Sequence, residues 1–101
     1  MGQLRHGGLP KELILQLKAQ YAAEDFIEAG TYHGATAVWA AAHFDRVSTI
    51  EFSRPIYEEM RAEHGGIRNI SFVFGDSREA LRAILPTLHQ PAIFWLDSHW
   101  S

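Results

Sequence analysis

Residues 26–37 read Phe26-Ile27-Glu28-Ala29-Gly30-Thr31-Tyr32-His33-Gly34-Ala35-Thr36-Ala37, and they are the most informative segment of the chain. A short apolar run ends in an acid and then passes through two glycines into helix-forming residues. Glycine allows positive φ and close approach of a ligand, while the first turn of a helix offers unpaired N–H groups. The pattern predicts a strand, a ligand-binding turn and a helix. The alternative is that Gly30 and Gly34 only shape a tight turn, which any α/β domain needs.

Three later segments repeat the pattern of a short β-rich run that is closed by an acid. They are residues 46–51, ending in Glu51; residues 70–77, ending in Asp76 and Ser77; and residues 92–97, ending in Asp97. Glu51 follows the glycine turn by about twenty residues, the spacing at which a nucleotide-binding unit presents a carboxylate to a ribose. Its two oxygens can accept both hydrogens of a vicinal diol.

Helical patterns lie between these segments. We expect four helices: one opened by Leu9-Pro10 with apolar positions Leu13, Ile14, Leu17 and Tyr21, one over 36–44, one from an N-cap at Ser53 to His64, and one that starts at Asp76 or Ser77 and ends before Pro86. Strands separated by single helices favour right-handed crossovers and a parallel sheet. The expected fold class is therefore α/β, a Rossmann-like three-layer sandwich with a parallel sheet and only its first four strands.

Length and composition fit one small domain. The chain has 101 residues, a hydrophobic share of 47% and a net charge of −3, with no cysteine. We expect a flexible tail over 1–8 and a partial domain over 9–101. The absence of basic runs argues against nucleic acid as a ligand, and the absence of an apolar stretch of about 20 residues argues against a membrane span. With no signal peptide visible, we expect a cytoplasmic protein.

Together, the segment Glu28 to Gly34, Glu51, the Gly75-Asp76-Ser77 step and the ending Leu96-Asp97-Ser98-His99 resemble class I S-adenosylmethionine-dependent methyltransferases. The resemblance is to the N-terminal, cofactor-binding half of that family and covers nearly the whole chain from Phe26. It implies a methyltransferase, or the cofactor-binding half of one, that acts on a small-molecule acceptor. The chain departs from the common Gly-x-Gly turn of the family, since Gly30 is followed by Thr31 and Tyr32.

The resemblance also implies roles at the methionine end of the cofactor. Gly30 and Gly34, with the backbone of Thr31 and Tyr32, would surround the methionine portion. Glu28 would lie near its amine.

At the nucleoside end, the resemblance implies that Glu51 holds the ribose hydroxyls and that Phe52 lies against the adenine. Asp76 and Ser77 would meet the adenine edge. Asp97 would lie beside the reactive methyl group.

The chemistry of the cofactor agrees with this composition of the site. S-adenosylmethionine carries a sulfonium, an amine and a diol, which suit several carboxylates and aromatic rings. The chain has no Gly-x-x-x-x-Gly-Lys-Ser/Thr loop for phosphates, and Gly30-x-x-x-Gly34 does not match the Gly-x-Gly-x-x-Gly of dinucleotide binders. A nicotinamide or flavin dinucleotide ranks second.

The candidate catalytic residues are Asp97 and His99. Methyl transfer needs alignment, and it needs a base only when the acceptor must lose a proton, a role open to His99. The alternative is that His99 is an exposed histidine just past a strand. Asp97 and His99 could share a divalent metal, but two ligands do not complete a site, so we predict no metal.

The strand over 92–96 is expected to form an apolar edge of the sheet. Such an edge invites pairing with another chain. We therefore expect a homo-oligomer such as a dimer, or a C-terminal half that supplies further strands and the acceptor pocket. The competing hypothesis is a non-enzymatic α/β assembly module, or a truncated scaffold without turnover.

Overall fold

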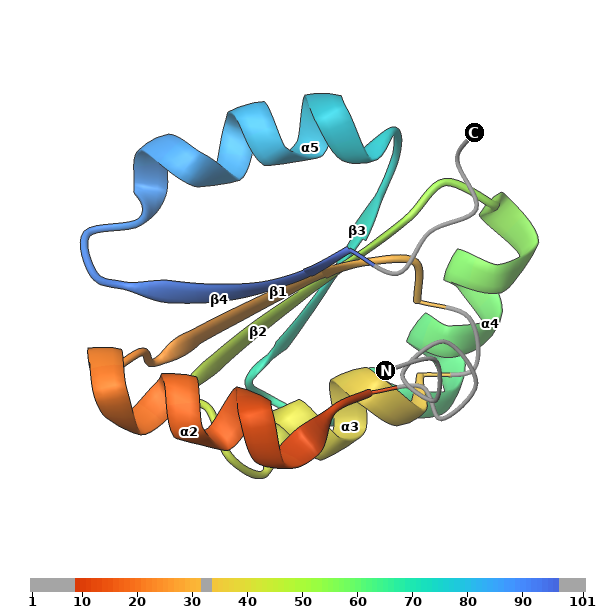
Figure 1. Cartoon of the computed structure of the whole chain (residues 1–101). Helices are drawn as coiled ribbons and strands as arrows, with labels where there is room; N and C mark the ends of the chain where they lie inside the picture. The colour runs from red at the N-terminus through yellow and green to blue at the C-terminus, as the bar shows by residue number, and fades with distance from the viewer. Residues whose placement is uncertain (1–8, 32–33, 97–101) are drawn as a thin grey trace.

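The computed structural model describes residues 9–31 and 34–96, and Figure 1 shows the course of the chain. Helices and strands alternate as the sequence predicts. In chain order they are α2 (Lys11–Tyr21), β1 (Asp25–Ala29), α3 (Ala35–Ala41), β2 (Arg46–Glu51), α4 (Arg54–His64), β3 (Ile70–Phe74), α5 (Ser77–Ile84), the 3-10 helix η1 (Leu85–Thr87) and β4 (Ala92–Leu96). The predicted tail over 1–8 lies outside the described residues.

The four strands form one parallel sheet in the order β3-β2-β1-β4. Each crossover carries one α-helix, followed in the last crossover by η1, and such a connection is what parallel neighbours require. The prediction of a parallel sheet with the strand over 92–96 at its edge is confirmed, since β3 and β4 are the edges of the described sheet and β4 lies beside β1. All strands therefore end at the same side, where ligands bind in open α/β sheets.

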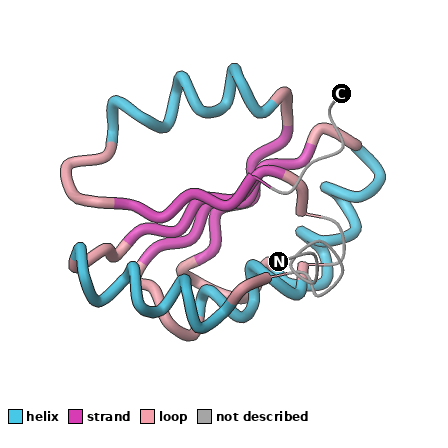
Figure 2. The backbone as a smooth tube through the Cα atoms, in the orientation of Figure 1, coloured by secondary structure: helices cyan, strands magenta, loops and turns pink. Residues whose placement is uncertain are grey.

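Helices cover both faces of the sheet. Figures 1 and 2 show α2 and α3 below the sheet and α5 above it. α4 lies beside the carboxyl end of β3, where the rings of Tyr57 and Phe74 are 5.4 Å apart. The predicted Rossmann-like three-layer sandwich is thus confirmed.

The core lies mainly between the sheet and the pair α2 and α3. Phe26 of β1 is fully buried, and its ring lies 5.2 Å from that of Phe44 and 6.4 Å from that of Trp39. Ala37 and Ala40 are the buried positions of α3, so the helix can approach the sheet closely. The central strand β1 is buried along its whole length, which fixes the position of the turn that follows it.

Arg46 and Asp25 join the amino ends of β2 and β1. The Arg46 guanidinium donates from Nε to Asp25 Oδ1 at 2.6 Å and from Nη2 to Oδ2 at 3.1 Å. This two-point contact raises the pKa of Arg46 above its already high ordinary value. The pair sets the register of the two strands at the end opposite to their acids.

Some predicted helix details differ from the structure. α3 ends at Ala41 rather than at Phe44, because the chain turns there to bring Phe44 into the core. In α2 only Ile14 is buried, while Leu13 is 48% and Tyr21 is 55% exposed. Ser53 is the N-cap of α4, as predicted, but its side chain makes no capping hydrogen bond.

Candidate functional site

The glycine turn lies at the carboxyl ends of β1 and β2, the two central strands. Gly30 has φ 103° and Gly34 has φ 82°, a backbone conformation that side chains disfavour. Gly30 N–H donates to Ile50 O at 2.8 Å, and Gly34 N–H donates to Thr31 O at 2.9 Å. The two glycines thus close a compact turn that is fixed to β2.

Glu51, the last residue of β2, organises this edge through its carboxylate. Its Oε1 accepts the Thr31 N–H at 2.9 Å, and its Oε2 accepts the Ser53 N–H at 3.0 Å. The residue is only 4% exposed. One carboxylate therefore fixes both the turn after β1 and the start of α4.

Glu28 is linked to the same turn through two threonines. Thr49 Oγ1 donates to Glu28 Oε1 at 2.8 Å, and the hydroxyls of Thr31 and Thr49 are 2.7 Å apart. Glu28 is 1%, Thr49 0% and Thr31 4% exposed. Buried polar groups of this kind are costly unless each is paired, and no buried side-chain polar atom of the described residues lacks a hydrogen bond.

The hydrogen bonds of the turn determine which ligands it suits. The N–H groups of Gly30, Thr31 and Gly34 are all used within the protein. A phosphate-binding turn presents such groups to its ligand. In its described part, this turn instead combines internally used donors with two nearby carboxylates, so the edge favours a ligand that brings donors or positive charge.

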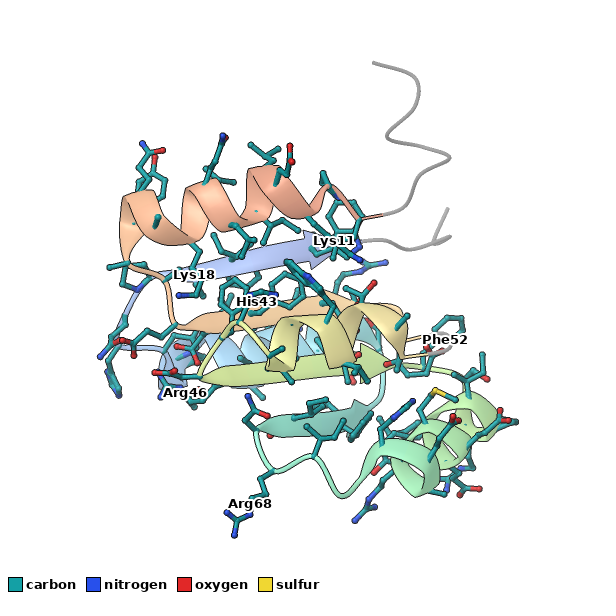
Figure 3. The ribbon with its side chains drawn as sticks, turned by 90° about the horizontal axis from the view of Figure 1, so that it is seen from below. Lys11, Lys18, His43, Arg46, Phe52 and Arg68 are labelled. Carbon is teal, nitrogen blue, oxygen red and sulfur yellow. The ribbon has the colours of Figure 1, made fainter. Side chains whose placement is uncertain are left out.

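The predicted nucleoside residues lie at the same edge. Phe52 is 78% exposed and projects just beyond the end of β2, at the opposite end of the strand from Arg46 (Figure 3).

The loop after β3 lies beside the end of β2. Gly75, with φ 146°, donates its N–H to Glu51 O at 2.9 Å and brings the two strand ends together. Asp76 caps α5 by accepting the Arg78 N–H at 2.7 Å, and Ser77 is the first residue of that helix.

Several predicted site residues lie outside the described part of the chain. These are Tyr32 in the turn and the candidate catalytic residues Asp97 and His99. The structure does bring together at one edge the remaining predicted residues, which are Glu28, Gly30, Thr31, Gly34, Glu51, Phe52, Asp76 and Ser77.

Thr49 is the site residue that sequence reasoning missed. Its register partner in β1 is Glu28, and it precedes Glu51 by two residues, so all three side chains point to the same sheet face. The only available signal was the spacing of two residues between Thr49 and Glu51 in β2. Threonine is common in strands, so that signal does not distinguish a buried threonine that bonds to two site residues from an ordinary strand residue.

Two grooves lie away from the glycine turn. One of about 600 Å³ runs between α4 and the end of β3, where the Arg54 guanidinium lies 4.7 Å from the centre of the Phe74 ring. The other, of about 620 Å³, lies near the amino ends of β2 and β3 and includes Arg46 and Arg68 in its lining. Neither is lined by Glu28 or Glu51, so we place the candidate site at the glycine turn.

Within residues 9–31 and 34–96, no cluster of three or more histidines and acids could hold a metal ion. In the same ranges no helix combines the length and the apolar character needed to cross a bilayer. Comparison of the chain with models of known protein families and with curated protein sequences found no match in either case.

Proposed function

We propose that the chain binds S-adenosylmethionine at the carboxyl edge of β1 and β2. In this proposal it is a cytoplasmic methyltransferase, or the cofactor-binding half of one, that acts on a small-molecule acceptor. The proposal is supported by the arrangement of the turn, where the described N–H groups are used internally while two carboxylates flank the turn.

The electrostatics of this edge match the cofactor at its methionine end. The amine of S-adenosylmethionine is a cationic donor, and its sulfonium adds a second positive charge. Charge-assisted hydrogen bonds to a carboxylate are roughly twice as strong as neutral ones. Glu28 accepts hydrogen bonds from this amine. A nucleoside di- or triphosphate would instead bring negative charge toward Glu28 and Glu51, which is unfavourable.

The nucleoside end uses different residues. Glu51 holds the ribose hydroxyls, since carboxylate oxygens accept hydroxyl hydrogens and the N–H groups of Thr31 and Ser53 fix the position of this carboxylate at the edge. The exposed ring of Phe52 lies against the adenine, and Asp76 and Ser77 border the base. Stacking of a base on an aromatic ring contributes about 1–3 kcal/mol.

The cofactor would supply an activated methyl group, and the protein mainly aligns it with the acceptor nucleophile. Asp97 and His99 remain the candidate catalytic residues, with His99 as the base for an acceptor that must lose a proton.

A second candidate function is assembly without turnover. β4 is an edge strand of the described sheet, and its residues Ala92–Leu96 carry no charge. Phe94 and Leu96 are 41% and 51% exposed. Pairing through this edge would form a homo-oligomer or recruit further strands.

Isothermal titration of the purified chain with S-adenosylhomocysteine tests the first function, with ADP and NADH as controls that present phosphates. We expect saturable binding of S-adenosylhomocysteine alone. Phe52→Ala should weaken that binding without affecting folding, because the ring is mostly exposed. Glu51→Gln should also weaken that binding, and Glu59→Gln, which removes an exposed acid of α4, is its matched control and should leave binding unchanged. Association that depends on protein concentration, with no ligand bound, would favour the assembly function instead.

A further inference from the structure

We infer that Thr49 is a positioning residue for the methionine end of the ligand site, acting through Glu28 and Thr31. The inference rests on the proposed function, because it concerns how the residues of that site are oriented. The hydroxyl of Thr49 is bonded to Glu28 and to Thr31, so Thr49 acts on a ligand through these two neighbours.

The geometry places Thr49 between the acid and the turn. Its hydroxyl lies 2.8 Å from Glu28 Oε1 on the neighbouring strand and 2.7 Å from the hydroxyl of Thr31 in the turn. The parallel register sets Thr49 directly opposite Glu28. A β-branched side chain on a strand has few χ1 choices, so its hydroxyl is held in a defined direction.

Counting hydroxyl protons gives each bond a direction. Thr49 has one hydroxyl proton and donates it to the Glu28 carboxylate. The contact between the two hydroxyls therefore uses the proton of Thr31, with Thr49 as the acceptor. Thr31 also donates its N–H to Glu51, so both of its donors are directed into the protein. Thr49 thereby fixes one oxygen of Glu28 and one donor of the turn.

The effect falls mainly on one end of the proposed ligand, because Glu51 keeps its hydrogen bond from the Ser53 N–H when the Thr49 hydroxyl is lost. Glu28 is assigned to the amine of the methionine portion, whereas Glu51 and Phe52 are assigned to the ribose and the adenine. Loss of the Thr49 hydroxyl should therefore weaken recognition of a ligand that carries the amine. It should leave a ligand without that amine largely unaffected.

Two ligands and two substitutions separate positioning from packing. S-adenosylhomocysteine carries the amine, and 5′-methylthioadenosine has the same nucleoside without it. Thr49→Val keeps the branched shape but removes the hydroxyl, and we expect it to weaken S-adenosylhomocysteine about 10- to 100-fold, the loss expected for a hydrogen bond to a charged group. Binding of 5′-methylthioadenosine should stay within about twofold, and Thr49→Ser should restore most of the affinity for S-adenosylhomocysteine.

Thr87→Val is the matched control, because it removes the hydroxyl of an exposed threonine that donates to Ile84 O at 2.6 Å. It should leave both affinities unchanged. Urea unfolding of each variant, followed by tryptophan fluorescence, establishes that the proteins compared are folded.

Three results would overturn the inference: equal loss of both ligands in Thr49→Val, no loss of either, or failure of Thr49→Ser to restore binding. If the unsubstituted chain binds neither ligand, the proposed function fails separately. Hydrogen exchange of the Thr31 amide, which donates to Glu51, then decides whether Thr49 orders the turn. Faster exchange in Thr49→Val but not in Thr49→Ser supports that role, and unchanged exchange overturns it.

Discussion

Gly34→Ala should destabilise the fold strongly for a substitution that adds only one methyl group. Gly34 has φ 82° and is the N-cap of α3, so the chain enters the helix through a left-handed residue. A Cβ at this position would lie 2.9 Å from Cδ2 of His64 and 3.2 Å from Sδ of Met60. Both of these residues belong to α4, so the substitution disturbs the contact between the turn and that helix.

The expected loss in the free energy of unfolding of Gly34→Ala has two contributions. Left-handed backbone in an alanine costs roughly 1–2 kcal/mol. Overpacking commonly adds 1–3 kcal/mol, and the lower end applies because the contacted atoms are at the ends of side chains that can shift. We therefore expect a loss of about 2–3 kcal/mol, a large part of the roughly 5–15 kcal/mol that stabilises a domain.

Urea unfolding followed by tryptophan fluorescence measures this loss, and two further glycines separate its terms. Gly75→Ala should show only backbone strain, since Gly75 has φ 146° and its Cβ would meet nothing within 4 Å. Gly66→Ala should show no loss, because its Cβ also has open space and its φ lies outside the left-handed range. Adding His64→Ala to Gly34→Ala should relieve part of the contact. If Gly34→Ala is as stable as Gly66→Ala, the described turn is wrong.

Three further outcomes can be measured with single substitutions. Asn69→Ala should lower the free energy of unfolding by about 1–2 kcal/mol, because its Nδ2 donates to two backbone carbonyls at 2.9 and 3.0 Å; an unchanged urea midpoint would contradict this. Arg46→Lys should lower the midpoint slightly, since lysine cannot reproduce the two-point contact with Asp25. Because the pKa of Arg46 is raised in the folded protein, the stability that the Arg46–Asp25 pair contributes is fully present below the ordinary arginine pKa and is lost only at still higher pH. The decrease in urea midpoint caused by Arg46→Lys should therefore be equal at pH 6 and pH 9. Phe52→Ala should weaken S-adenosylhomocysteine about tenfold with an unchanged urea midpoint, and equal affinity in the titration would remove Phe52 from the site.

The order of elements could be predicted from the sequence because its signals are local. Gly30 and Gly34 mark the turn into α3, Ser53 and Pro55 mark the start of α4, and Asp76 marks the start of α5. Short β-rich runs that alternate with these helices leave a parallel sheet as the simplest arrangement. The described acids that close β1, β2 and β3 then fall at one edge without further information.

The hydrogen-bond network inside that edge could not be predicted in the same way. It depends on the register of β1 against β2, which sets Thr49 opposite Glu28 across 21 residues of sequence. The degree of burial is also set by tertiary packing. Leu13 shares the helical pattern of α2 with Ile14, yet only Ile14 is buried, since one side of α2 faces the sheet.

An NMR titration measures directly whether a ligand binds at the carboxyl edge of β1 and β2. The ¹⁵N-labelled chain would be titrated with S-adenosylhomocysteine while its backbone amide shifts are followed. We predict saturable shifts centred on Thr31, Phe52 and Gly75, with little change at Arg46 and Asn69 near the amino ends of the strands. No saturable shift, or shifts confined to the amino ends of the strands, would contradict ligand binding at this edge.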